Sequence, residues 1–146
     1  EAWRNGWFHT GDAFLSDADG NYFFVDRKKD ALRRRGENVS SFEIEALVGR
    51  HPAIAECAAI GVDTAVGEQE IKIYVVRRPE VELTPQSLIE FLVPTMPHYM
   101  VPRFVEFVAS LPKTEATFRV QKAKLRERPL NKNTWDRVAA GMVVPK

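Results

Sequence analysis

Apolar residues recur with two periodicities along the chain, and the longer one, close to a helical turn, predicts two helices. The first helix begins at Ser40, which opens a capping box, and carries an apolar stripe at one-turn spacing within residues 44–48. The second begins at Thr84 and has Pro85 at its first position, where proline loses no hydrogen bond. Its apolar stripe lies within residues 88–92.

Alternation of apolar and polar residues, together with β-branched runs, predicts strands between and after these two helices. Residues 54–62 form an apolar run with small residues, residues 70–77 alternate between apolar and polar, and residues 103–108 follow a turn bounded by prolines. A short third helix is expected over residues 122–128. The order of helix, strand, strand, helix, strand, helix predicts a small α+β domain with a three-stranded sheet flanked by helices.

A β-hairpin segment is expected before this domain. Residues 22–25 are aromatic and β-branched, the turn formers of residues 17–21 precede them, and residues 13–15 can pair with them. Residues 26–35 then carry six basic side chains among ten residues. Because one alanine and one leucine are the only apolar members of this run, we interpret it as a boundary and not as a core element.

The composition is that of an ordinary globular protein and disfavours several functional classes. The 146 residues carry a formal net charge of +1, so nucleic-acid binding through overall charge is not expected. The single cysteine, Cys57, cannot form an internal disulfide, and one cysteine with three scattered histidines argues against a structural zinc site. We expect neither a membrane span, which needs roughly 18 apolar residues, nor a signal peptide.

The first segment with candidate chemistry is the turn at residues 6–12, which ends in Thr10, Gly11 and Asp12. An ionised carboxylate directly after a tight turn can accept hydrogen bonds from two neighbouring sugar hydroxyls. This arrangement predicts a ribose contact at Asp12. A plain turn closed by Gly11 is the alternative, and it carries about equal weight.

Two further segments combine cations with backbone freedom. The basic run of residues 27–35 is followed by Gly36, which would let a phosphorylated ligand approach the backbone closely. A solvated charged face is the alternative for this run. Residues 111–122 begin with a Pro-Lys-Thr sequence and are typical of an exposed, mobile loop that carries cations. The alternative here is an ordinary surface loop.

Together, these motifs resemble the adenylate-forming acyl-CoA synthetase family, which includes AMP-forming acid–CoA ligases, firefly luciferase and the adenylation domains of peptide synthetases. The similarity runs in order through nearly the whole chain. It is carried by residues 6–12, 25–39, 42–45, 51–58, 100–102 and 111–126.

The resemblance implies a division of the chain and a reaction. Residues 1–28 would be the end of a large N-terminal adenylating domain, and residues 29–146 a mobile C-terminal domain. The whole cytoplasmic enzyme would join a carboxylic acid to ATP, with Mg²⁺ held mainly by the N-terminal domain, and release pyrophosphate. After rotation at a hinge, the thiol of coenzyme A would displace AMP. The isolated piece is expected to be inactive because it lacks most of the substrate pocket.

The resemblance also assigns nucleotide and hinge positions. Asp12 is similar to the family's ligand of the AMP ribose hydroxyls, and Arg27 is similar to the arginine that contacts the same ribose. Lys29 falls at the hinge position, where one or two backbone dihedrals must change freely.

The coenzyme A face is implied by the neighbouring segment. Gly36 resembles the glycine beside which the pantetheine arm passes, and Arg33 and Arg35 occupy basic positions on the same thioester-forming face. These cations favour free coenzyme A as the acceptor because its 3′-phosphate seeks positive charge. A carrier protein as the acceptor remains the alternative.

The sequence departs from the family at the last motif. Arg119 stands where the family's catalytic lysine is expected, and Phe118 stands in place of the preceding glycine. Arginine keeps the charge, but it is bulkier and planar, so the exchange is not neutral. Lys113 or Lys122 is therefore an alternative cation for adenylation. A catalytically silent family member that only binds nucleotide or coenzyme A is the second functional hypothesis.

Overall fold

The computed structural model describes residues 2–34, 36–64, 67–127 and 129–144. In chain order, its elements are β1 (Trp3–Arg4), β2 (Trp7–Phe8), β3 (Asp12–Ser16), β4 (Tyr22–Arg27), β5 (Leu32–Arg34), β6 (Glu37–Val39), α1 (Ser41–Val48), β7 (Ile54–Asp63), β8 (Gln69–Arg77), α2 (Pro85–Leu92), β9 (Phe104–Phe107), α3 (Lys122–Arg126) and β10 (Trp135–Asp136). None of the helices in these ranges is long and apolar enough to cross a membrane.

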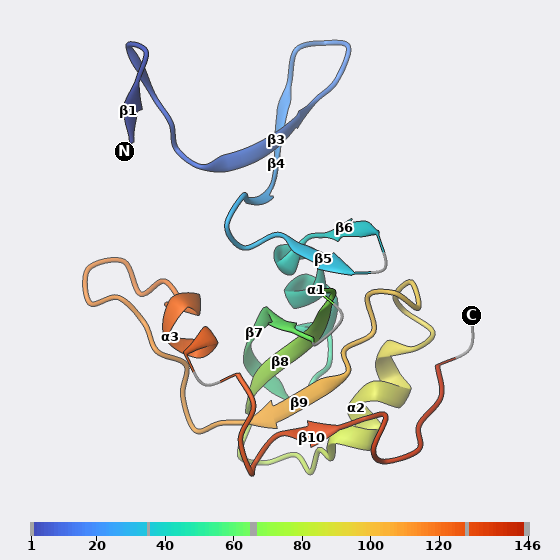
Figure 1. Cartoon of the computed structure of the whole chain (residues 1–146). Helices are drawn as coiled ribbons and strands as arrows, with labels where there is room; N and C mark the ends of the chain where they lie inside the picture. Colours follow the sequence, from blue (N-terminus) through green and yellow to red (C-terminus); the bar gives the residue numbers. More distant parts are fainter. Residues whose placement is uncertain (1, 35, 65–66, 128, 145–146) are drawn as a thin grey trace.

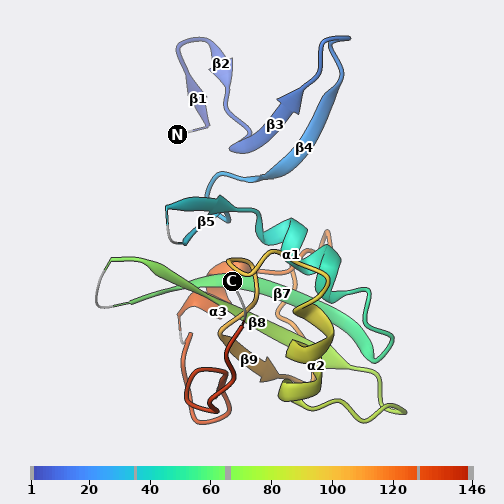
Figure 2. The same cartoon turned by 90° about the vertical axis from the view of Figure 1, so that its right-hand side faces the viewer.

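The expected hairpin segment forms and lies apart from the main body of the molecule (Figure 1). Strands β3 and β4 pair antiparallel, with Asp12 opposite Arg27 and Ser16 opposite Tyr22. The smaller β1–β2 pair precedes them. The polypeptide then passes through residues 28–31 into the β5–β6 hairpin, whose strand β5 lies beside α1, between the β3–β4 hairpin and the main sheet (Figure 2).

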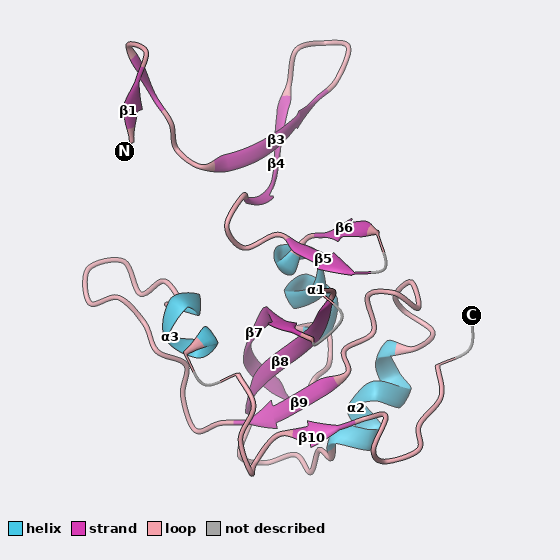
Figure 3. Ribbon diagram, in the orientation of Figure 1, coloured by secondary structure: helices cyan, strands magenta, loops and turns pink. Residues whose placement is uncertain are grey.

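The main sheet contains the three expected strands and a short fourth one, in the order β10-β9-β8-β7 (Figure 3). Strands β7 and β8 form a long antiparallel pair that runs from Ile54 opposite Arg77 to Asp63 opposite Gln69. Strands β8 and β9 are parallel, with α2 in the connection between them. Two-residue strand β10 adds to the free edge of β9, where no periodic signal marks it.

Helices α1 and α2 cover one face of this sheet and form the main core. The alternating positions Ile71, Ile73 and Val75 of β8 are fully buried in this core, as the sequence pattern predicts. Both helices begin at the expected caps, with Ser40 and Thr84 accepting hydrogen bonds from backbone amides of the first turn. The caps and the apolar stripes therefore determine these two helices locally.

The opposite face of the sheet is covered as well, by α3 and the chain that leads into it. Its smaller apolar cluster includes Phe104 and Leu111, with Leu125 of α3 packed against it. Lys72 and Tyr74 of β8 also lie on this side and are almost completely buried. Since both faces are covered, even the charged positions of the central strand are removed from solvent.

The interpretation of residues 26–35 as lacking core positions is wrong. Leu32 and Arg34 of β5 are each 2% exposed, and Leu32 belongs to the main core. The Arg34 guanidinium donates to the carbonyl oxygens of Tyr99 and Val101 and lies 2.7 Å from the Glu70 carboxylate. A short strand needs only one leucine to reach the core, and these oxygens make the burial of an arginine tolerable.

Candidate functional site

The structure brings four of the residues singled out in the sequence to one cleft of about 590 Å³. Asp12 comes from β3, Arg27 from β4, Arg119 from the loop before α3, and Lys122 from α3 itself. The cleft therefore lies between the N-terminal hairpin and the C-terminal body. Its remaining lining residues are Phe24, Asp26, Asp30, Phe42, Glu45 and Val120.

Asp12 is placed by the turn that precedes it and by its strand partner. Gly11 has a φ of 78°, in the left-handed region that glycine adopts without strain. In the antiparallel pair that follows, the Nε atom of Arg27 lies 3.5 Å from the Asp12 Oδ1 atom. This Oδ1 atom is buried and accepts no hydrogen bond from the described residues. A buried acceptor in this state is suited to a donor from outside the chain, such as a hydroxyl group.

Arg119 is held by its backbone, while its guanidinium is not engaged. Its amide donates to the Thr114 hydroxyl at 3.2 Å, and its carbonyl accepts from the Thr114 amide at 2.9 Å. The side chain is exposed, and within the described part of the chain its guanidinium has no hydrogen-bond or ion-pair partner. The loop thus presents to the cleft a positive charge that forms no ion pair with a carboxylate of the described residues.

Lys122 lies in the same cleft, but its charge is already compensated. Its Nζ atom lies 2.7 Å from the Glu45 carboxylate and donates to the Ser41 hydroxyl at 2.7 Å. Only 13% of the side chain is exposed. An ammonium group held in this way has less freedom to follow a reacting group than Arg119 has. No role of Ser41 or Glu45 could be predicted from the sequence, since neither residue is unusual at the start of a helix.

Lys29 lies beside the cleft in the turn that joins the two bodies. With Arg119 and Arg126 it lines an adjoining cavity of about 400 Å³. Asp30, the next residue, is nearly buried, and its carboxylate accepts from Arg126 at 2.7 Å. The turn is therefore anchored immediately after Lys29, while Lys29 itself is exposed.

The residues expected on the coenzyme A face do not line this cleft. Gly36 lies in the β5–β6 hairpin with a φ of 81°, so backbone conformation alone favours glycine at this position. Arg33 is exposed on β5, and its amide donates to the Gln69 side chain. Arg35 lies outside the described residues.

Cys57 borders the Lys122 network from the β7 side but is not a nucleophile at neutral pH. Its Sγ atom lies 3.4 Å from the Glu45 carbonyl oxygen. Burial, followed by the nearby Glu45 carboxylate, raises the pKa of the thiol to about 12. The thiol is therefore protonated and behaves as a small packing residue.

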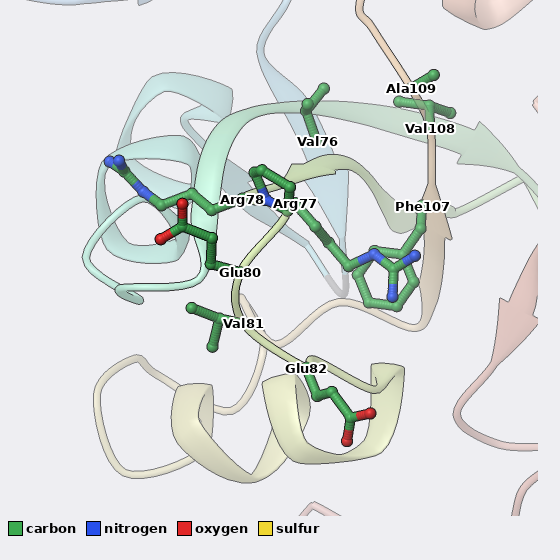
Figure 4. Close-up of a pocket in the computed structure, with 10 residues that line it drawn as sticks. Val76, Arg77, Arg78, Glu80, Val81, Glu82, Phe107, Val108 and Ala109 are labelled. Atoms are coloured by element: carbon green, nitrogen blue, oxygen red, sulfur yellow. The ribbon is translucent and has the colours of Figure 1, made fainter.

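A second cavity of about 510 Å³ lies at another place in the fold, between the loop after β8 and the end of β9 (Figure 4). The Arg77 guanidinium covers the Phe107 ring at 4.6 Å and reaches the Leu83 carbonyl oxygen. The Arg78 Nε atom donates to the Ile54 carbonyl oxygen. None of the residues singled out in the sequence lines this cavity. Its two arginines already have partners within the protein.

Groups that could hold a metal ion are absent from the described ranges: no three His, Cys, Asp or Glu side chains converge. Independently of metals, the main cleft is lined by four carboxylates and three cations: Asp12, Asp26, Asp30, Glu45, Arg27, Arg119 and Lys122. It can bind a hydroxylated sugar at Asp12 and an anion at Arg119.

Comparison with known proteins identifies the family. The model for the C-terminal domain of AMP-binding enzymes matches residues 43–117. A long-chain-fatty-acid–CoA ligase of Escherichia coli is 40% identical over 124 residues, which cover 85% of this chain and 22% of the relative. A crotonobetaine/carnitine–CoA ligase of Citrobacter koseri is 37% identical over 109 residues, covering 75% and 21%. The chain thus spans about a fifth of these relatives.

Solved structures agree with this similarity. An anthranilate–CoA ligase in complex with anthranoyl-AMP superposes with a TM-score of 0.75 at 33% identity, over 95% of this chain and 26% of that one. ATP-bound MatB from Rhodopseudomonas palustris gives a TM-score of 0.77 at 31% identity, over 86% and 25%. The mixed α/β body is the fold of C-terminal domains in adenylate-forming enzymes.

Proposed function

Because this chain belongs to the family of C-terminal domains of AMP-binding enzymes, we propose that it is the C-terminal part of an AMP-forming carboxylic acid–CoA ligase. The complete enzyme uses ATP to convert an acid to an acyl-adenylate with release of pyrophosphate. It then transfers the acyl group to the thiol of coenzyme A, with AMP as the leaving group. Relatives that are named as CoA ligases of fatty acids and of carnitine support this reaction class.

The observation that carries the proposal is the convergence of Asp12, Arg27 and Arg119 on one cleft. The Oδ1 atom of Asp12 accepts no hydrogen bond from the described residues and suits the ribose hydroxyls of ATP, while its ion pair to Arg27 keeps the carboxylate in place. The unneutralised guanidinium of Arg119 suits the negative charge that collects where the acid carboxylate attacks the α-phosphate. Asp12 and Arg27 thus serve to bind the sugar, and Arg119 serves to stabilise the reacting anions.

Arg119 is the better candidate than Lys122 for the adenylation cation. Both side chains line the cleft, but Lys122 is bound to Glu45 and Ser41. Withdrawing it would leave the Glu45 carboxylate without its cation in a partly buried place. Arg119 can approach the substrate at no such cost.

The hairpin segment supports the division of the chain into residues 1–28 and 29–146. Large hydrophobic side chains are exposed all along β1 to β4. They are Trp3, Trp7, Phe8, Phe14, Leu15, Tyr22, Phe23 and Phe24. Contiguous exposed aromatics of this kind mark a surface that another part of the protein covers. We assign that part to the large N-terminal domain, which fits relatives about five times longer than the matched segment.

Rotation at Lys29 explains why the two sets of expected residues lie apart. In the present arrangement the Arg119 loop faces Asp12 and Arg27, as adenylation requires. Gly36 and Arg33 belong to the C-terminal body and do not line this cleft. Turning that body about Lys29 would move the Arg119 loop away from the hairpin segment and bring the Gly36 side toward it. Coenzyme A would then enter beside Gly36 in the second half-reaction. Mg²⁺, which supplies charge neutralisation of the phosphates when bound, is assigned to residues of the large domain.

ATP–pyrophosphate exchange by the full-length enzyme, measured with a panel of carboxylic acids, tests this proposal. Arg119→Ala should lower the exchange rate about 10² to 10³-fold, the usual effect of removing one donor to a developing anion. Arg119→Lys should stay within about tenfold of the natural protein, because the charge is kept and only the planar fork is lost. Exchange that is indifferent to both substitutions would contradict the role of Arg119.

One observation favours a second candidate, a member that binds nucleotide or coenzyme A without adenylating an acid. Phe118 and Arg119 depart together from the glycine and lysine of the family. Exchange at background level in the natural protein, restored by Arg119→Lys, would support this candidate. Dependence of the second half-reaction on a carrier protein, in place of saturation by coenzyme A, would change the acceptor in the main proposal.

A further inference from the structure

Asp26 is a buried carboxylate at the end of the N-terminal hairpin, and α1 supplies its partners. The side chain is 5% exposed. Its Oδ2 atom accepts from the Ser41 amide at 2.6 Å and from the Ser41 hydroxyl at 2.9 Å. The Ser40 hydroxyl is shared between this oxygen at 3.2 Å and the Val25 carbonyl oxygen at 3.0 Å. Burial of a carboxylate is tolerated when it is hydrogen-bonded in this way, here at the positive end of a helix.

The Ser41 hydroxyl connects Asp26 to the cation in the cleft. It donates to Asp26 and accepts from the Nζ atom of Lys122 at 2.7 Å. The same ammonium lies 2.7 Å from Glu45 of α1. These hydrogen bonds form one continuous chain, here called the relay, from Asp26 of β4 through Ser41 of α1 to Lys122 of α3. The relay ends on a residue of the loop–helix segment that also carries Arg119.

This relay crosses the proposed hinge. Asp26 precedes Lys29 in the chain, whereas Ser41 and Lys122 follow it. Next to the relay, the rings of Phe24 and Phe42 meet edge to face with their centroids 5.9 Å apart. This contact also joins a residue before Lys29 to a residue after it. Rotation of the C-terminal body about Lys29 would separate these pairs. The relay is therefore compatible with one of the two arrangements only.

We propose that Asp26 is a positioning residue for adenylation, which acts through Ser41 to fix Lys122 and to hold the Arg119 loop against the cleft. This inference rests on the function proposed above and adds a residue to it. Although Asp26 also lines the cleft, in this role it acts through Ser41 and not through a contact with the substrate. Its contribution is to favour the arrangement in which Arg119 faces Asp12 and Arg27, and it must release Ser41 before thioester formation.

The experiment compares two half-reactions in the full-length enzyme carrying Asp26→Asn. The asparagine keeps the shape of the side chain but removes the charge that accepts from Ser41. ATP–pyrophosphate exchange should fall at least tenfold, while thioester formation from supplied acyl-adenylate and coenzyme A should stay within about twofold. Ser41→Ala removes only the hydroxyl relay and should shift the ratio of the two rates in the same direction. Asp63→Asn, an exposed carboxylate on β7, serves as the control and should change neither rate.

Equal loss in both half-reactions, or no change in either, would overturn the assignment, because the relay must stabilise only the arrangement used for adenylation. A misfolded Asp26→Asn protein leaves Ser41→Ala as the decisive variant, with the same two outcomes.

A distance measurement separates this inference from the proposed function. Spin labels at positions 19 and 124, in a Cys57→Ser background, report the separation of the hairpin and α3. The Asp26→Asn variant should broaden or shift the distance distribution relative to the protein with Asp26. If the protein shows no ATP–pyrophosphate exchange at all, the proposed function fails. The distance distribution still tests whether Asp26 holds the hairpin against α3. Identical distributions with and without Asp26 would overturn it.

Discussion

Phe118 adopts a backbone φ of 52°, in the left-handed region, at the position where the family has glycine. The ring is 76% exposed, so burial of the side chain does not offset this strain. A residue with a Cβ atom loses roughly 1 kcal/mol or more in this conformation. The backbone at position 118 therefore favours glycine, the residue that the sequence resemblance predicts there.

We predict that Phe118→Gly is more stable than Phe118→Ala by about 1 kcal/mol. Both variants lose the aromatic ring, so their difference reports the backbone conformation alone. At a position with negative φ the order would be reversed, because alanine restricts the unfolded chain more than glycine does. Urea unfolding of both variants gives the free energies. Greater stability of the alanine variant would show that the loop leaves the left-handed conformation.

At this scale the sequence identifies residues better than it identifies their partners. The motif order locates Asp12, Arg27, Arg119 and Lys122, and the structure places all four in one cleft. The sequence cannot distinguish the two cations of the last motif, because the difference lies in Glu45, more than 70 residues away in the chain. Long-range pairing of this kind follows from the packing of α1 against the loop and not from local spacing.

Among the elements, β8 carries a charge that is buried inside the main body. Lys72 is fully buried, and its ammonium lies 2.5 Å from the Glu106 carboxylate of β9. The same ammonium donates to the hydroxyl of Thr134. Burial acts to raise the pKa of Glu106, but hydrogen bonds from Lys72, Asn131 and Thr134 outweigh it and hold this pKa below the ordinary value. The network ties the segment after α3 to the sheet.

This network predicts a loss of stability in acid. Since the pKa of Glu106 is lower in the folded state than in the unfolded chain, its contribution is complete above the ordinary value of 4.5 and disappears as the pH falls through the folded value. Glu106→Gln should lower the free energy of unfolding at pH 7 by about 3 kcal/mol, because it leaves the Lys72 ammonium uncompensated. It should also flatten the dependence on pH below 4.5.

Urea unfolding between pH 7 and pH 3 checks both effects, with Glu80→Gln in an exposed loop as the control. An acid dependence as steep in Glu106→Gln as in the natural chain would assign the acid loss to other carboxylates.

The elements with local signals could be predicted, and those stabilised by distant partners could not. Capping residues and apolar periodicity predict α1 and α2, an apolar run with small residues predicts β7, and alternation predicts β8. Strand β5 could not be predicted, because an arginine such as Arg34 is typical of a surface position. The carbonyl oxygens of Tyr99 and Val101, which accept from its guanidinium, are distant in the sequence. Strand β10 has two residues and exists only as a partner of β9.

For the whole molecule, the proposed function depends on how the hairpin and the C-terminal body move against each other. The turn between them is closed by backbone hydrogen bonds that Asp30 and Ala31 donate to Arg27, while Lys28 donates to Gly11. The amide of Lys29 is not among these donors. Proline at position 29 therefore removes none of these donors, and it fixes one of the two dihedrals about which the proposed rotation turns.

We predict that Lys29→Pro slows thioester formation by at least tenfold and changes ATP–pyrophosphate exchange by less than threefold in the full-length enzyme. The present arrangement already brings Arg119 to the cleft with Asp12 and Arg27, so the first half-reaction needs no change at the hinge. Single-turnover measurement of each half-reaction checks this, and Lys29→Ala, which removes the charge but leaves the dihedral free, should affect neither step strongly. Equal losses in both half-reactions would place the hinge elsewhere. In that case Asp26 and Ser41 would not lie on opposite sides of the moving joint.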